Sequence, residues 1–98
     1  MTQSANLDLE KLGRDAAEHV AGADAIEQVE VAAGEDSTDR PIYRFSFLIN
    51  HDRLQERIGM VGTRLHQRLR DELIELGDPH YPVIQIWDRK DWDKRKRA

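Results

Sequence analysis

The residues best suited to chemistry in this sequence are arginines that recur along one segment. Residues 53–70 contain a single acid, Glu56, and five arginines at polar positions: Arg53, Arg57, Arg64, Arg68 and Arg70. Arginine neutralises phosphate groups, and binding of that kind weakens steeply as the salt concentration rises. The pattern therefore predicts a surface for a polyanion, although arginines also solvate ordinary helix faces.

Two glycines interrupt the same segment and leave two interpretations open. Gly59 and Gly62 stand three residues apart in Gly-Met-Val-Gly. If residues 53–76 form one helix, the glycines cost about 2 kcal/mol relative to alanines and allow close approach of a neighbouring strand. If the chain turns there between two short helices, the bare backbone can lie against a phosphate chain. The amides of a following helix, capped by Thr63, would then add a favourable dipole.

Other chemistry finds little support. The chain has no cysteine, and its histidines (19, 51, 66 and 80) show no metal-ligand spacing. The nearest candidate, Asp78-x-His80 beside Pro79, is more typical of a turn. No nucleophile elbow, phosphate loop or carboxylate pair stands out. We therefore expect a protein that is not an enzyme and that holds neither a metal nor a cofactor.

The arginines must be positioned by a long amphipathic segment, residues 50–77. Asp52 and Gln55 resemble a capping box at its start, and Gly77 followed by Asp78-Pro79 ends it. Its apolar residues recur at steps of three or four, which predicts a helix with one buried stripe. The stripe consists of Leu54, Ile58, Val61, Leu65, Leu69, Leu73 and Leu76.

The remaining elements predict a small α+β domain. A first helix begins near Ser4 or Asn6 and ends near Gly22; residues 25–33 and 42–49 form an antiparallel hairpin with the first strand at a sheet edge. The aromatic-rich face of 42–49 should meet the long helix. Residues 83–87 are almost continuously apolar, which predicts a strand in the middle of the sheet. The expected order is α-β-β-α-(α)-β: a three-stranded sheet with helices on one face.

Chain length and charge distribution indicate how the chain is divided. At 98 residues the chain is expected to be one domain, 6–88, with a flexible tail at 1–5 and a basic tail at 89–98. Residues 1–39 hold ten acids and two bases, whereas 40–98 hold nine acids and 13 bases. The later half could present an anion-binding face, or the halves could simply attract each other. With neither a membrane span nor a signal region visible, a cytoplasmic protein is expected.

The run from Ile58 to Leu65, apolar-Gly-x-x-Gly-x-x-apolar, resembles type II KH domains, and Val83–Trp92 is similar to the last strand and basic tail of the KH domain in Era-type GTPases. The resemblance implies the same element order and a GXXG loop that clamps about four nucleotides of RNA. A fainter resemblance, in Arg57–Val61 and Asp91-Trp92, links the chain to the BolA-like family, whose members often share an iron–sulfur cluster with a glutaredoxin. Ile58 stands where that family has a histidine, so no cluster is expected.

Two functions remain open at this level. The first is a module that binds single-stranded RNA, with Trp87, Trp92 and Tyr81 as candidates for stacking on bases. The second is a protein-interaction or oligomerising domain that uses the acidic first helix or the strand near residues 27–33. The residues predicted to bind RNA are Arg57, Gly59, Met60, Val61, Gly62, Arg64, Arg68, Arg89, Lys90, Lys94, Arg95, Lys96 and Arg97.

Overall fold

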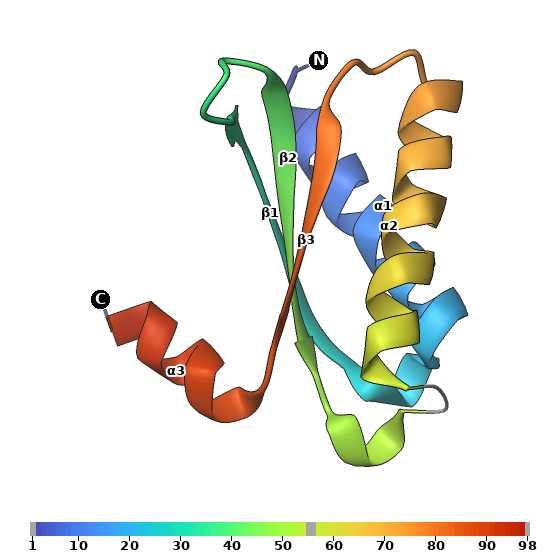
Figure 1. The fold of residues 1–98 in the computed structure, drawn as a ribbon, viewed down its shortest axis with the longest axis vertical. Coiled ribbons are helices and arrows are strands. Elements are labelled where there is room, and N and C mark those ends of the chain that lie inside the picture. Colours follow the sequence, from blue (N-terminus) through green and yellow to red (C-terminus); the bar gives the residue numbers. More distant parts are fainter. Residues whose placement is uncertain (1, 55–56, 98) are drawn as a thin grey trace.

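The computed structural model describes residues 2–54 and 57–97, with side chains over 9–54 and 57–95. Three strands and three α-helices follow one another in an α-β-β-α-β-α order (Figure 1), and two short 3₁₀ helices, η1 and η2, flank the hairpin. The elements are α1 (Thr2–Ala21), η1 (Ala23–Ala25), β1 (Ile26–Glu35), β2 (Pro41–Ile49), η2 (His51–Arg53), α2 (Ile58–Glu75), β3 (Tyr81–Trp87) and α3 (Arg89–Arg97). The α+β class and the predicted order through β3 are confirmed.

The sheet has the order β1-β2-β3. β1 and β2 pair antiparallel, so the predicted hairpin and the edge position of the first strand are confirmed. β3 pairs with β2 in parallel and forms the other edge, so the prediction that residues 83–87 lie in the middle was wrong. The crossover through α2 returns β3 to the free side of β2, and helices pack on both faces of the sheet. A strand covered in this way can be apolar throughout and still lie at an edge.

One face of the sheet packs against α1 and α2 (Figure 1). Phe45 and Phe47 point into this core and are fully buried, as are Val61, Leu65 and Leu69 of α2. The predicted contact between the aromatic face of β2 and the stripe of the long helix is therefore confirmed. α1 contributes mainly small residues to the same core, which allows its backbone to lie close to the sheet: Ala16, Ala17 and Ala21.

The ends of both long helices are set by glycines, as predicted. Gly22 follows α1 with φ 96°, and Gly77 follows α2 with φ 73°. The Gly77 amide donates to the Ile74 carbonyl at 3.0 Å and the Asp78 amide to the Leu73 carbonyl at 2.9 Å, the paired bonds of a Schellman ending. This ending turns the chain out of α2 and into β3.

The third helix, α3, lies on the opposite face of the sheet from α1 and α2 (Figure 1). It occupies most of the segment predicted as a basic tail, and α1 likewise begins at Thr2, within the segment expected to be flexible. Trp92 of α3 is only 2% exposed, and Leu48, on the face of β2 opposite Phe45 and Phe47, is fully buried. Within the described residues, no helix is both long and apolar enough to cross a membrane.

Candidate nucleic-acid interface

The N-cap residue of α2 does not cap the helix with its own side chain. Arg57 is the N-cap residue, with extended backbone (φ −67°, ψ 141°) and no side-chain cap bond. Its carbonyl accepts the first helical hydrogen bond, from the Val61 amide at 3.0 Å. The amides of Ile58, Gly59 and Met60 precede that bond, so they have no acceptor within the helix and carry its partial positive charge.

The two glycines of Gly-Met-Val-Gly lie inside this single helix. Both sequence interpretations were therefore wrong in part, because the helix begins at Ile58 rather than near residue 53 and the glycines separate no helices. Thr63 is not a cap; its hydroxyl donates to the Gly59 carbonyl at 3.2 Å, as in a helix interior. A methyl group on Gly59 would meet no atom of a neighbouring element within 4 Å, and one on Gly62 would lie 3.8 Å from Ile86 Cδ1. Packing on the sheet therefore does not require glycine at either position.

Three of the predicted arginines fall into one row along α2. Arg57, Arg64 and Arg68 are separated by seven and four residues, which places them on one side of a helix. Arg57 and Arg64 are exposed, whereas Arg68 is partly buried with Nε 3.6 Å from Glu72 Oε1. Arg70 is exposed and lies on a different side of the helix. The fold thus keeps part of the predicted basic surface together at the start of α2.

The apolar residues of the predicted site divide between surface and core. Met60 is 43% exposed beside the arginine row, and Ile58 is exposed to the same extent. Val61 is fully buried in the core. Its side chain holds α2 on the sheet and cannot contact a ligand, so Val61 does not belong to the interface.

The basic residues at the end of the chain lie on α3, across the sheet from the arginine row. Arg89 donates to Glu27, and Arg95 Nη2 donates to Glu30 Oε1 at 2.8 Å. Both arginines therefore fasten α3 to β1 instead of extending the surface on α2. Lys90 and Lys94 are exposed on α3. The side chains of Lys96 and Arg97 lie outside the described residues.

The tryptophans are not free to stack on bases. Trp92 is a buried residue of α3, and the guanidinium carbon of Arg95 lies 4.0 Å from the centroid of the Trp92 ring. Trp87 is partly buried, 5.4 Å from the same guanidinium. Tyr81 is 48% exposed, and its ring centroid lies 5.2 Å from that of His66 on α2. Of the three residues proposed to stack on bases, it has the most accessible ring.

Asp78 and His80 form a turn, as the sequence indicated. Asp78 Oδ1 accepts from the His80 amide at 2.9 Å and lies 2.6 Å from His80 Nδ1, while the Tyr43 hydroxyl donates to Asp78 Oδ2 at 2.7 Å. Tyr43 also stacks on the His80 ring at 3.9 Å. Burial raises the pKa of Asp78, but these hydrogen bonds outweigh burial and hold that pKa below its ordinary value. The cluster joins β2 to the turn before β3, which is a structural role.

The α3 side of the sheet holds a polar pocket, and of the residues that line it only Arg95 belonged to the predicted site. Arg44 and Ser46 of β2 line it together with Gln85 of β3, Glu30 of β1 and Arg95 of α3. The signal in the sequence was the alternation in residues 42–49, which places an arginine and a serine on the face opposite the aromatic residues.

No group of three or more histidine, aspartate or glutamate side chains that could hold a metal ion occurs in the part of the chain that the structure describes. Compared with known proteins, the sequence matches no family model and no curated protein, and the fold matches no solved structure.

Proposed function

We propose that this protein is a small module that binds the backbone of single-stranded RNA at the start of α2. The observation that supports it is the combination found there: helix amides that the N-cap side chain does not bond, an open glycine, and exposed arginines on one side of the helix. No acidic residue occurs between Arg57 and Arg70, so nothing within that stretch of sequence repels a phosphate. As proposed, the protein binds without catalysis and acts in the cytoplasm, where such RNA is present.

Each group has a distinct task in this proposal. The amides of Gly59 and Met60 donate to one phosphate, favoured by the positive end of the helix dipole. Gly59 leaves room for the nucleotide chain because no neighbouring element fills the space beside it. Arg57 and Arg64 neutralise the adjacent phosphates, and the exposed Met60 side chain offers an apolar contact to a sugar or base.

The interface is small, since Arg89 and Arg95 of α3 are paired with glutamates on the far face of the sheet. Binding should accordingly be weak and should depend on few phosphates. For single strands the logarithm of the binding constant falls by about 0.7 per neutralised phosphate for each decade of salt. Two or three contacts predict a shallow slope of about −1.4 to −2.1.

Fluorescence anisotropy with a short labelled oligoribonucleotide tests the proposal. Titrations between about 50 and 200 mM salt should give the slope above. In the double variant Arg57→Ala/Arg64→Ala the slope should approach zero and binding should weaken for every sequence. Gly59→Ala keeps the charge but fills the space beside the helix amides, so it should also weaken binding.

The matched control is Lys11→Ala/Arg14→Ala, which removes two positive charges from α1. Both residues pair on the surface of α1, Lys11 with Asp15 and Arg14 with Glu18. This control should bind RNA almost as the unmodified protein does. Equal losses in the two double variants, or no binding at the lowest salt, would refute an interface at α2.

The alternative function, a protein-interaction or oligomerising domain, is supported by the two edges of the sheet. β1 carries Glu27, Glu30 and Glu35, and charges of this kind discourage pairing with another strand. β3 (YPVIQIW) carries no charge at the opposite edge. An uncharged apolar edge strand is a template for an added strand, so we propose β3 as the contact if RNA is not the ligand.

Sedimentation velocity over a range of protein concentrations examines this alternative. A second copy paired along β3 would raise the sedimentation coefficient with concentration, and Ile84→Lys should abolish the increase. A constant monomer at all concentrations would exclude self-association through β3.

A further inference from the structure

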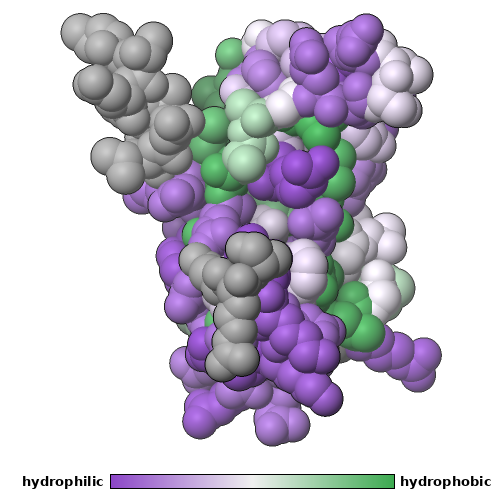
Figure 2. All heavy atoms as spheres, turned by 90° about the vertical axis from the view of Figure 1, so that its left-hand side faces the viewer, coloured by the Kyte–Doolittle hydropathy of each residue, from purple (hydrophilic) through white to green (hydrophobic). Residues whose placement is uncertain are grey.

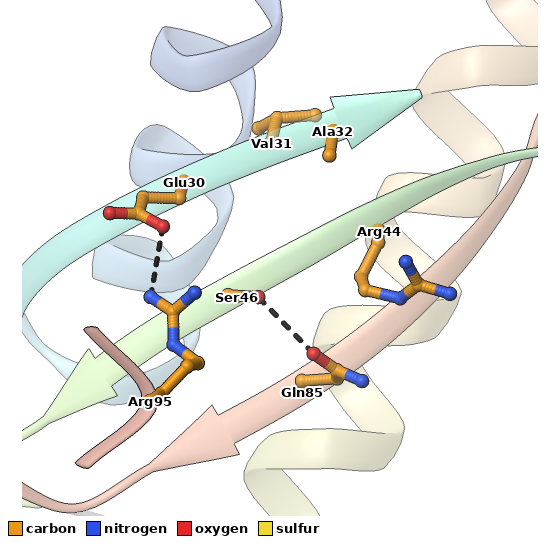
Figure 3. Close-up of a pocket in the computed structure, with 7 residues that line it drawn as sticks. All are labelled: Glu30, Val31, Ala32, Arg44, Ser46, Gln85 and Arg95. Atoms are coloured by element: carbon orange, nitrogen blue, oxygen red, sulfur yellow. Dashed lines mark hydrogen bonds and ion pairs between the residues drawn. The ribbon is translucent and has the colours of Figure 1, made fainter. Parts of the chain in front are cut away.

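A pocket of about 430 Å³ lies on the α3 side of the sheet, away from the arginine row of α2. Its walls come from all three strands and from Arg95 of α3. Figure 3 shows the Arg95–Glu30 ion pair at one end, Arg44 at the other, and Ser46 with Gln85 between them. The volume is that of a small-molecule site rather than a macromolecular groove.

Hydrogen-bond donors outnumber free acceptors in this pocket. The Gln85 carbonyl oxygen accepts from the Ser46 hydroxyl at 3.3 Å, which leaves the Gln85 amide nitrogen with two N–H groups to donate. The carboxylate that lines the pocket, Glu30, already accepts from Arg95 Nη2 at 2.8 Å. Arg95 Nε is buried, and no described residue accepts a hydrogen bond from it. The missing partners are acceptor oxygens.

Arg44 is the main unbalanced charge. It stands on the central strand, and its neighbours in register are Ala32 on β1 and Val83 on β3, which cannot pair with a guanidinium. None of the ion pairs formed among the described residues includes Arg44. A guanidinium presents parallel N–H groups that match the two oxygens of a carboxylate or phosphate.

The opposite end of the pocket is held rigid before any ligand arrives. The Arg95 guanidinium is stacked 4.0 Å from the centroid of the buried Trp92 ring and is tied to Glu30. Ser46 is almost completely buried between β1 and β3, and its hydroxyl fixes the orientation of the Gln85 amide. A site whose side chains are already ordered loses less entropy on binding.

We propose that this pocket binds the oxyanion group of a small molecule, a carboxylate or a phosphate, with Arg44 and the Gln85 amide as its donors. The carboxylate or phosphate lies against Arg44, and the body of the molecule extends along Ser46 towards Arg95. This proposal is independent of the RNA interface, which lies on the other side of the sheet and involves none of these residues.

Titration of the ¹⁵N-labelled protein, followed by amide chemical shifts, tests the pocket. The probes are succinate, inorganic phosphate and the neutral succinamide, each at constant ionic strength. Saturable shifts are expected at residues 30–32, 44–46 and 83–85 for at least one of the two anions and not for succinamide. Whether succinate or phosphate binds more tightly distinguishes the two ligand classes.

Arg44→Gln should weaken binding of the preferred anion about ten-fold or more, the loss of one charge-assisted pair. Arg44→Lys keeps the charge but not the paired N–H groups and should give an intermediate affinity. The matched control, Arg70→Gln on the exposed side of α2, should leave the shifts unchanged. Shifts that do not saturate, or that persist in Arg44→Gln, would overturn the proposal. A native-like amide spectrum of each variant shows that the variant has folded.

Discussion

The two faces of the sheet differ in how completely other side chains cover them and in how many polar groups they present. The face under α1 and α2 is closed by apolar side chains, and Phe45 and Phe47 are fully buried there. The other face is covered at one end by α3 and elsewhere presents Arg44 and Gln85. Figure 2, viewed from the α3 side, shows a largely hydrophilic surface with smaller hydrophobic areas between polar side chains.

The difference indicates which face supplies stability and which is available for binding. Apolar burial on the α1–α2 face contributes folding energy in proportion to the area removed from water. The α3 face retains donors without acceptors, a condition that costs stability when such groups are buried and that a ligand can relieve. A compact domain of this size thus keeps its core on one side and presents polar groups that have no hydrogen-bond partner in the described part of the chain, Arg95 Nε among them, on the other.

The largest expected effect separates two adjacent residues of β2 on opposite faces. Phe45→Ala should lower the free energy of unfolding by about 3–5 kcal/mol, because a fully buried aromatic ring is lost and a cavity remains. Arg44→Ala should change it by no more than about 0.5 kcal/mol, since Arg44 is exposed. Urea denaturation measures both. A loss of similar size at Arg44 would mean that the α3 face carries part of the core.

Glycines on the two sides of the helical layer should respond with opposite signs. A methyl group on Gly13 of α1 would lie 3.0 Å from Phe45 Cδ2 and 3.3 Å from Val29 Cγ1. Overpacking costs about 1–3 kcal/mol, which should exceed the gain in helix propensity of about 1 kcal/mol. Gly59→Ala has open space beside it and should stabilise the fold by up to about 1 kcal/mol. Thermal unfolding of both variants gives the comparison, and stabilisation by Gly13→Ala would show that α1 packs more loosely than described.

A further expected effect concerns Tyr43, at the end of the sheet face that packs against α1 and α2. Tyr43→Phe removes the 2.7 Å hydrogen bond to Asp78 and should lower the free energy of unfolding by about 1.5 kcal/mol. Burial, and then the hydrogen bond to Asp78, raise the pKa of Tyr43 to about 12, so its neutral form is favoured in the folded state. The stabilisation that this provides is complete below pH 10 and is lost as the pH rises towards 12.

The pH dependence of the stability that Asp78 contributes has the opposite sign to that of Tyr43. Its lowered pKa contributes stability above the ordinary value of 3.8, and this contribution is lost as the pH falls below that value. Tyr43→Phe should abolish the alkaline loss and raise the pKa of Asp78, which carboxyl chemical shifts report. An unchanged Asp78 pKa in the variant would show that the hydroxyl does not interact with the carboxylate.

Much of the fold was readable from local pattern. The alternation in residues 42–49 and the three-to-four spacing in residues 58–73 each specify one buried face, and burying both together defines the core. The glycines at 22 and 77 ended helices as predicted because only glycine adopts those backbone angles without strain. By contrast, residues 89–98 were predicted to form a basic tail and not a packed helix, because the anchoring residue, Trp92, is a single aromatic side chain among charged ones.

The candidate sites were less predictable because they depend on distant contacts. Spacing alone placed Arg57, Arg64 and Arg68 in one row, since helical periodicity is local. It could not show that Arg89 and Arg95 pair with Glu27 and Glu30, more than 60 residues away in the chain. Nor could it bring Arg44 and Gln85 into one pocket, which requires the pairing of β2 with β3.

The sequence by itself determined the element types through β3, the C-terminal ends of α1 and α2, and the core-facing side of β2 and α2, because these follow from backbone preferences and the periodicity of apolar residues. Only the tertiary structure decided the strand order, the side on which α3 packs, and which charges are paired. Those outcomes depend on how separate elements meet in space, where hydrogen bonding and charge pairing act between residues that the sequence keeps far apart.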